Sequence, residues 1–591
     1  MKTNVKIIGS AFRISRTPQG AFAAHRNFPN RAQFDFTVYT RTFLVDHLQP
    51  TAPHWNHHRD HWVDAGMGAV ETSLKEKRGW FGLFACGLII GLVLRFYLAS
   101  FAQMPGHGDS AFYYTVAKNI ANGRGPVIDY IVYFFSGLLP LPHYAGDFWN
   151  PSASFLIAIP MMLFGKTISF ALIAPIMAGI IPAVAGYLAG RYFSSSIKIG
   201  VLTGILTFFS PFQVWFSTTT EAIIFAGAFG SISIYFMMKG FKKPKYFFLA
   251  AFSSGIANLI RQDDILLLVA LVICILLVST TWKNKIAITL AVISIHFLIL
   301  SPLMIKNYME FHALFPPGPA RTAFLTTYED FHSYGKKIDW KTFRATWGIL
   351  GILSHKWHAA QENLGQVNDF LNPLFTVLFF ISLADVLLIH SNRNRLLLLV
   401  PASLFAVFEY LFYTVIASFS GPGSLIKSLG ILMPFICLII IDFFANYFRP
   451  KFLLVSAIIL LSAYGGYQGF KRNYTSTVYY NNVYQEYKIV RSIILDDANQ
   501  QKINANNITV LARDTWDVYE GTGFKTVMIP NNDIPTIVFV AQHYNARYIL
   551  LPGQRPQLDK IYNNTTPDPH FTYVASVPNS DMKIFRINYS P

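Results

Sequence analysis

The sequence is short of charge. Charged residues make up only 13% of its 591 residues, about half of the roughly 25% that soluble domains carry. Hydrophobic residues reach 53%, and the mean hydropathy is +0.37. This composition excludes a cytosolic enzyme, a disordered protein and a coiled coil. The 53 Phe and 30 Tyr suit a chain that meets lipid and places aromatic rings at the interface. We therefore predict a polytopic membrane protein.

Cysteine is also scarce. Cys86, Cys274 and Cys437 each fall inside an apolar run, so disulfides are not expected. No Cys/His spacing typical of a metal site is present either, and we assign no metal ligands.

The net charge of +17 and the pI near 9.5 could suggest a nucleic-acid partner. In a membrane protein, however, surplus Lys and Arg usually lie in cytoplasmic loops and set the topology. We expect membrane lipids as partners and no nucleic acid.

Runs of about 20 apolar residues can cross a bilayer as helices, and we predict about 11–13 such helices. The runs are Trp80–Phe101, Ile168–Gly190, Ile199–Phe216, Thr218–Met238, Tyr246–Ile260, Ile265–Thr280, Ile286–Ile305, Phe370–His390, Leu396–Ala417, Leu425–Ala445 and Phe452–Gly469. A shorter run, Ser152–Phe164, is interpreted as a half-helix or re-entrant segment, with a tilted full span left open.

The basic loops set the orientation. When Ser152–Phe164 does not span, every loop rich in Lys and Arg falls on the cytoplasmic side, as the positive-inside rule requires. Residues 79–470 then form the membrane domain, with outer loops 102–151 and 306–369. Residues 471–591 form an extracytoplasmic domain. We expect a bacterial plasma membrane, with the active site outside.

The first 78 residues are polar and basic, and they carry a patch of four histidines: His54, His57, His58 and His61. A metal site would need partners and a framing fold, which this patch lacks. We expect a disordered cytoplasmic tail. Met67 is an alternative start of the protein.

The C-terminal region resembles a soluble α/β domain. Strands are expected at Ile508–Ala512, Thr526–Ile529, Tyr548–Leu551, Thr572–Val577 and Lys583–Ile587, and helices at Asn482–Leu495 and Ile534–Tyr544. Strands that alternate with helices indicate a small layered domain.

The most informative stretch follows the first span and runs from Gly106 to Gly125. Asp109 opens an amphipathic helix that Gly123 and Gly125 end. A carboxylate at this level can face a polar cavity yet be partly desolvated, which suits a general base.

Here the sequence resembles a known family. Asp109 with Tyr113 or Tyr114 and the closing Gly123-Arg124-Gly125 look like the first-loop motif of the GT-C glycosyltransferases, of the protein O-mannosyltransferase, aminoarabinose-transferase and RgtA/B/C/D-like type. The resemblance covers roughly residues 80–300 and continues at Trp149-Asn150-Pro151, at Ser210-Pro211 with Glu221, and at Arg261-Gln262-Asp263.

The resemblance implies transfer of a sugar from a polyprenyl-phosphate donor to a hydroxyl acceptor (lipid, glycan or protein) on the outer face of the membrane. It also implies inversion of the anomeric centre, with Asp109 as the catalytic base. The lack of a DxD stretch, which is typical of enzymes that use nucleotide sugars, agrees with a lipid-linked donor.

Further residues are assigned to this site. A departing phosphate needs a cation, and the guanidinium of Arg261 matches phosphate oxygens. Glu221 is assigned a catalytic role; His107, Tyr113, Tyr114, Asp147 and Asp263 are assigned to substrate binding. Ser110 stands where many relatives carry a second acid. This puts a metal-binding role for that acid in doubt, although a divalent cation remains possible and Glu221 or Asp147 could substitute.

Each assignment has a structural alternative. Asp109 could cap the following helix, and Glu221 could be a first-turn acid that stabilises a helix dipole. Arg261 with Asp263 could be an ion-paired turn, and the two tyrosines could belong to an aromatic belt. Arg95 is expected to extend to the membrane interface.

Two other functions stay open: a transporter or flippase of a lipid-linked saccharide, and a glycan ligase or polymerase. Transporters usually show internal hydropathy repeats, and none is clear here. The polar segment Lys306–Asp369 is too long for a simple connection and is expected to form a lid that helps to select the acceptor.

Overall fold

The computed structural model describes residues 62–417, 424–448, 450–553, 555, 557–564 and 567–589. The histidine patch and residues 1–61 of the expected tail lie outside the described residues. The domain boundaries at residues 78 and 470 stay predictions.

The region before the C-terminal sheet is mostly helical. Its α-helices are α1 (Trp62–Ala99), α2 (Gly108–Ala121), α3 (Ser152–Phe164), α4 (Ile168–Ala171), α5 (Ile173–Ala178), α6 (Ile180–Ser194), α7 (Ile197–Phe208), α8 (Pro211–Phe216), α9 (Ile223–Gly240), α10 (Tyr246–Ile260), α11 (Ile265–Leu277), α12 (Trp282–Phe311), α13 (Pro317–Arg321), α14 (Trp340–Leu371), α15 (Pro373–Ala384), α16 (Arg393–Leu411), α17 (Ser424–Ser428), α18 (Met433–Tyr447) and α19 (Lys451–Gln500). Short 3-10 helices cover Gln262–Asp264, Thr322–Phe324, Tyr328–His332, Leu429–Leu432 and Ala505–Asn507, and π-helical turns cover Asp385–Ile389 and Phe412–Ile416.

Among the described residues, seven helical segments are long and apolar enough to cross a bilayer, or eight if the bent pair Trp340–Leu371 and Pro373–Ile389 is one span. This is fewer than the 11–13 expected, because several apolar runs break. The run Ile199–Phe216 divides before Pro211 into α7 and α8. At 1.5 Å per residue, the 15 residues of α10 reach only about 22 Å, less than the roughly 30 Å of a bilayer core.

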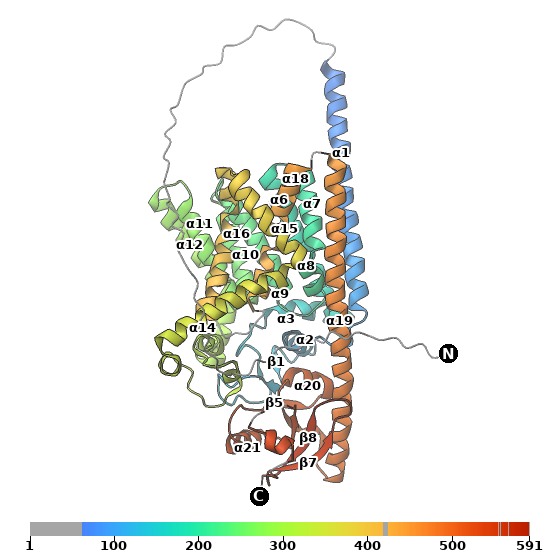
Figure 1. The fold of residues 1–591 in the computed structure, drawn as a ribbon, viewed down its shortest axis with the longest axis vertical. Helices are drawn as coiled ribbons and strands as arrows, with labels where there is room; N and C mark the ends of the chain where they lie inside the picture. Colours follow the sequence, from blue (N-terminus) through green and yellow to red (C-terminus); the bar gives the residue numbers. More distant parts are fainter. Residues whose placement is uncertain are drawn as a thin grey trace, which may run out of the picture. The chain divides into compact units, whose positions relative to one another are not determined.

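Helix α19 continues from the membrane region into the C-terminal region without a break (Figure 1). Its first half packs beside the end of α1, where the rings of Tyr97 and Phe470 stack with centroids 6.4 Å apart. Its second half covers the C-terminal sheet, through Val490 and Ile494. One rigid helix therefore belongs to both regions.

The C-terminal sheet has six strands, β2 (Tyr130–Ile131), β4 (Thr509–Ala512), β5 (Lys525–Met528), β6 (Tyr548–Leu551), β7 (Phe571–Ser576) and β8 (Lys583–Ile587), in the order β2-β5-β4-β6-β8-β7. Strands β2, β5, β4 and β6 are parallel, while β8 and β7 are antiparallel. Helices α20 (Thr515–Thr522), α21 (Ile534–His543) and α22 (Asp559–Tyr562) complete this region. A separate antiparallel pair joins β1 (Val127–Ile128) to β3 (His143–Tyr144).

Helices cover both faces of the sheet. Successive side chains of a strand point to opposite faces, so neighbouring residues of β4 pack against different helices. Leu511 packs with Ile537 of α21, whereas Val510 and Ala512 pack with α19 and α20. The expected strands are confirmed to within one residue at each end. The sheet also contains β2, which comes from the first outer loop, so that loop is fixed to the C-terminal region.

Arg95 does not extend to the interface, and that prediction is wrong. Its side chain is fully buried and donates to Ser217 Oγ at 2.7 Å and to the Phe208 carbonyl oxygen at 2.6 Å. A cation inside an apolar bundle is stabilised by such acceptors. Arg95 therefore fastens α1 to α7 and to the turn after α8.

Candidate active site

Asp109 lies in the first turn of α2, where it does not cap the helix. The N-cap is His107, and the Asp109 carboxylate instead receives a 2.6 Å hydrogen bond from Lys427 Nζ. The capping alternative is therefore wrong. The predicted helix is confirmed, and it ends where Gly123 adopts a positive φ of 77°, a conformation that favours glycine. The Asp109 side chain keeps 29% of its exposure, so a ligand can reach it.

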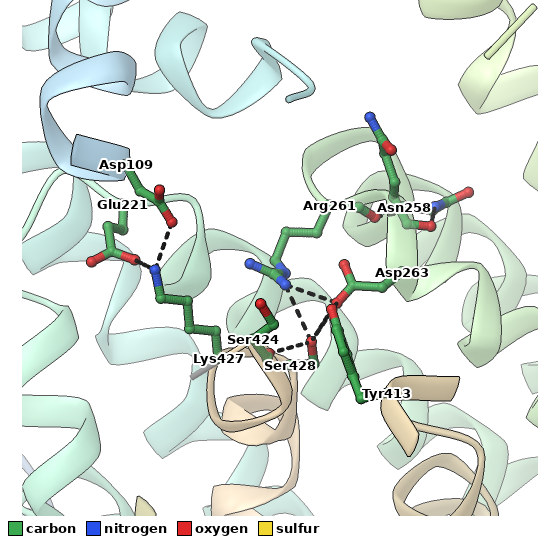
Figure 2. A network of polar contacts seen from close by, with 10 residues as sticks. Asp109, Glu221, Asn258, Arg261, Asp263, Tyr413, Ser424, Lys427 and Ser428 are labelled. Carbon is green, nitrogen blue, oxygen red and sulfur yellow. Dashed lines mark hydrogen bonds and ion pairs between the residues drawn. The ribbon is translucent and has the colours of Figure 1, made fainter. Parts of the chain in front are cut away.

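Lys427 joins two carboxylates (Figure 2). Its ammonium lies 2.6 Å from Asp109 and 3.1 Å from Glu221. The hydroxyl of Thr220 donates to the carbonyl oxygen of Ser110 at 2.6 Å, which ties the segment of Glu221 to the start of α2. Residues that are far apart in sequence thus form one charged cluster. We call Asp109, Glu221, His107 and Lys427 the lysine cluster.

Glu221 is the buried member of the lysine cluster. Only 2% of its side chain is exposed, and it pairs with His107 as well as with Lys427. Burial alone would raise the pKa of Glu221, but the charges of His107 and Lys427 outweigh it and lower the pKa to about 2. Glu221 precedes α9 and is not in its first turn, so the helix-dipole alternative is not confirmed.

A second cluster surrounds Arg261, at the end of α10. Its Nη2 donates to Asp263 at 2.8 Å and to Ser428 Oγ at 3.2 Å. Asp263 also accepts from the hydroxyls of Tyr413, at 2.7 Å, and Ser428. We call these four residues the arginine cluster. Burial would raise the pKa of Asp263, but the charge and hydrogen bond of Arg261 lower it.

The two clusters are neighbours, because Lys427 and Ser428 are consecutive residues of α17 (Figure 2). Lys427 turns toward Asp109 and Glu221, whereas Ser428 turns toward Asp263. The short helix α17 therefore contributes Lys427 to one cluster and Ser428, which contacts Arg261, to the other.

Amide side chains fix the segment that carries Arg261. Asn258 Nδ2 donates to the carbonyl oxygens of Arg261 and Gln262 at 3.1 and 2.8 Å. Gln262 Nε2 donates to Asn150 Oδ1 at 3.1 Å, and Asn150 Nδ2 donates to the Asn258 carbonyl oxygen at 3.1 Å. The Trp149-Asn150-Pro151 and Arg261-Gln262-Asp263 motifs, separate in sequence, are therefore joined in space.

The other predicted substrate contacts lie in different places. Tyr113 is buried, and burial raises the pKa of its hydroxyl, on which the charges of Arg261 and Asp109 also act. Tyr114 instead donates to the Lys166 carbonyl oxygen at 3.1 Å. Asp147 lies 3.8 Å from His143 Nε2. These contacts of Tyr114 and Asp147 involve residues outside both clusters, and their assigned roles stay predictions.

Sequence reasoning missed Lys427, Ser428 and Tyr413. Lys427 sits near the start of the apolar run Leu425–Ala445. A lone cation in such a run is costly in a membrane and usually functional, which was a usable signal. Tyr413 lies in a π-helical turn, and such turns often occur at functional sites but leave no pattern in the sequence.

The described residues contain no group of three or more His, Cys, Asp or Glu placed to hold a metal ion. The partners of Asp109 and Glu221 are Lys427, which contacts both carboxylates, and His107, which contacts Glu221. The geometry thus brings together carboxylates, the cations Lys427 and Arg261, and hydroxyl groups.

About a quarter of the chain matches a known family model. Residues 150–305 match the family model described as dolichyl-phosphate-mannose-protein mannosyltransferase. No curated protein sequence matches the chain.

Two solved structures are similar in fold. ArnT from Cupriavidus metallidurans, bound to undecaprenyl phosphate, gives a TM-score of 0.52 at 13% identity, over 87% of this chain and 98% of that one. The oligosaccharyltransferase AglB from Archaeoglobus fulgidus, in complex with an inhibitory peptide and a dolichol-phosphate, gives 0.50 at 10% identity, over 82% of this chain and 71% of that one. The predicted fold, a helical multi-span protein with a C-terminal sheet, is confirmed.

Proposed function

We propose that this chain is a glycosyltransferase of the GT-C superfamily and that it transfers a sugar from a polyprenyl-phosphate donor to a hydroxyl acceptor on the outer face of the membrane; the family match and the similar folds support this. The observation that carries the proposal is the half-exposed Asp109 beside Lys427, with Arg261 adjacent. A base and two cations at one place are what such a transfer requires.

In the proposed reaction, a carboxylate oxygen of Asp109 takes the proton of the acceptor hydroxyl. The acceptor oxygen forms a bond to C1 of the sugar while the bond from C1 to the phosphate oxygen breaks. The electron pair of that bond leaves with the polyprenyl phosphate. Attack opposite to the departing phosphate inverts the anomeric centre.

Lys427 and Arg261 are the groups proposed to stabilise the leaving phosphate. Lys427 is a compact charge on a flexible stem, whereas Arg261 offers a planar fork of donors. Lys427 contacts Asp109 directly, so a phosphate that attracts Lys427 releases an oxygen of Asp109 for the acceptor proton. Donor binding and activation of the base are then one event.

Glu221 is proposed to keep Lys427 in place. It is buried and contacts the ammonium together with the more exposed Asp109. His107 pairs with Glu221 in turn. Glu221 is thus a positioning residue in this proposal, rather than a second base.

Support for a lipid donor comes from the ligands of the similar structures, undecaprenyl phosphate in ArnT and dolichol-phosphate in AglB. A cavity of about 230 Å³ lies beside the arginine cluster. Its lining includes Asn258 and Gln262 on one side, and Leu300, Leu303 and Met304 of α12 on the other. Such a space suits the first apolar units of a prenyl chain beside its phosphate.

The test supplies the purified full chain, in nanodiscs, with undecaprenyl-phosphate and dolichyl-phosphate sugars and measures release of free polyprenyl phosphate. We expect at least one donor to be consumed. Movement of every donor across a vesicle membrane without cleavage would instead indicate a flippase.

Sidedness is tested separately with a cysteine in place of Asn506, an exposed residue of the C-terminal region. We expect a membrane-impermeant maleimide to label it in intact cells. Labelling only after the cells are opened would contradict the outer-face assignment.

A further inference from the structure

The parallel part of the C-terminal sheet has a topological switch point between β4 and β6. The chain leaves β4 and forms β5 on one side of it, then crosses over and forms β6 on the other side. In open parallel sheets, ligands bind outside the carboxyl ends of the strands at such a switch point. The segments that follow β4 and β6 at this edge carry Arg513 and Arg555, respectively.

Arg513 and Arg555 share one carboxylate. Nη2 of Arg513 lies 3.8 Å from Oε1 of Glu329, and Nη1 of Arg555 lies 3.5 Å from Oε2. These are long contacts for two guanidinium groups and one acid. The Glu329 side chain is 43% exposed, whereas that of Arg555 is 4% exposed. Glu329 is therefore the member that an incoming anion can replace.

Arg555 Nε and His332 Nδ1 are among the buried polar atoms at this edge that have no hydrogen-bond partner among the described residues. Burial and then the charges of Arg555 and Arg513 lower the pKa of His332 to about 3, so its ring is neutral and lies near both guanidinium groups. Buried polar atoms are normally satisfied. A ligand that carries oxygen atoms would satisfy these two.

This edge lies next to Asp109. The indole of Trp516, in α20, packs so closely on Gly108 that a Cβ there would lie 2.2 Å from it. Burial raises the pKa of the Tyr328 hydroxyl, which Arg513 opposes and Asp109 reinforces. The contact between Trp516 and Gly108 therefore places the switch-point edge beside the segment that carries Asp109.

We propose that the switch-point edge is the acceptor subsite: an anionic group of the acceptor, a phosphate or a carboxylate, binds between Arg513 and Arg555 in place of Glu329 and directs a hydroxyl toward Asp109. The fork of donors on arginine fits either anion. This inference rests on the proposed glycosyl transfer and adds to it the chemical class of the acceptor.

The experiment measures binding of three soluble probes, glucose 6-phosphate, glucuronate and glucose, to the full chain in neutral-lipid nanodiscs by calorimetry. We expect at least one charged probe to bind at least tenfold more tightly than glucose. The charged probe that binds more tightly shows whether the subsite prefers a phosphate or a carboxylate. Arg513→Gln should weaken that binding about tenfold, because a guanidinium that contacts the anion is lost. Glu329→Gln should tighten it several-fold, because the competing carboxylate is lost.

Arg547→Gln is the matched control, since Arg547 precedes β6 at the opposite edge of the same sheet. Equal binding of glucose and both anions, or equal weakening by Arg513→Gln and Arg547→Gln, overturns the inference. If Arg513→Gln does not fold, Glu329→Gln decides, and unchanged binding overturns the inference. Because no donor is present, this failure is distinct from a failure to consume donor.

Discussion

The lysine cluster and the arginine cluster use the same kinds of groups in different surroundings. In the lysine cluster, Asp109 is 29% and Lys427 20% exposed, and Lys427 contacts both carboxylates. In the arginine cluster, Arg261 is 16% and Asp263 9% exposed, and hydroxyls from Tyr413 and Ser428 complete the shell of Asp263. The lysine cluster is therefore the more exposed of the two, whereas the arginine cluster is more enclosed and is held by more hydrogen bonds.

This difference in exposure suggests different roles for the two clusters. A proton acceptor must be reachable by the acceptor hydroxyl, and a cation that can move from a carboxylate to a phosphate must not be held too firmly. A group that only orients a phosphate gains from rigid partners. We therefore propose that the lysine cluster supplies the base, and that the rigid arginine cluster chiefly holds and orients the phosphate that Arg261 contacts.

The largest effect is expected from Asp109→Asn, which removes the proposed base but keeps the shape of the side chain. Turnover of an identified donor should fall by about 10²–10⁴-fold. Asp496→Asn, an exposed change on α19, is the control. Full activity in a folded Asp109→Asn variant would remove the assignment of Asp109 as base.

Lys427→Gln should be next, with turnover lower by about 10²–10³-fold, the usual loss when one group that stabilises a developing anion is removed. Lys427→Arg should recover only part of the activity, because a rigid fork does not replace a compact ammonium. Steady-state kinetics would check both. An unimpaired Lys427→Gln enzyme would show that the open cluster does not perform the chemistry.

The buried half of the lysine cluster predicts a pH effect on stability. The pKa of Glu221 falls from its ordinary value of 4.5 to about 2 in the fold, so the carboxylate stabilises the folded state above about pH 4.5. That stabilisation, about 3 kcal/mol, should be lost as the pH falls from about 4.5 toward 2. Thermal unfolding in detergent should show a smaller decline over this window for Glu221→Gln. Parallel declines would contradict the ion-pair account.

Asp263→Asn tests the enclosed cluster. Arg261 would lose its charged partner and its fixed orientation, so the KM for donor should rise about tenfold while kcat changes less. Asp442→Asn is a matched control, because Asp442 forms a comparable pair with Arg395 at 2.8 Å elsewhere in the chain. A fall in kcat alone would place the arginine cluster in the chemistry as well.

The smallest effect is expected from Tyr114→Phe. The hydroxyl of Tyr114 contacts the Lys166 carbonyl oxygen, so its loss should cost about 1 kcal/mol of stability and change turnover less than twofold. A tenfold loss of turnover would support the substrate contact expected from the sequence. Thermal unfolding and donor turnover measured side by side would distinguish the two.

Much of the fold follows from local patterns. The five C-terminal strands and helices α2 and α21 are predicted nearly to the residue, because alternation of apolar residues and glycine at helix ends act over a few positions. The number of spans is less well predicted, since composition alone does not show where a run such as Ile199–Phe216 breaks. The pairing of β2 with β5 could not be predicted, because Tyr130 and Thr526 lie in different parts of the sequence.

The site is predicted in part. Asp109, Glu221, His107, Arg261 and Asp263 were all singled out, and the structure brings each of them into one of the two clusters. Their partner Lys427 is not predicted, because it belongs to none of the motifs and lies 318 positions from Asp109 in the sequence. Arg513 and Arg555 likewise become neighbours only when β4 and β6 are placed side by side.

By itself the sequence determined that this is a membrane protein, where its apolar segments lie, and which acids stand at their ends. Those features depend on the free energy of transferring side chains from water to an apolar environment and on interactions between residues that are close together in the sequence. Only the tertiary structure decided that Asp109 meets Lys427, 318 positions away, and that a sheet edge faces them. Such contacts depend on how whole helices and strands pack, which no local pattern encodes.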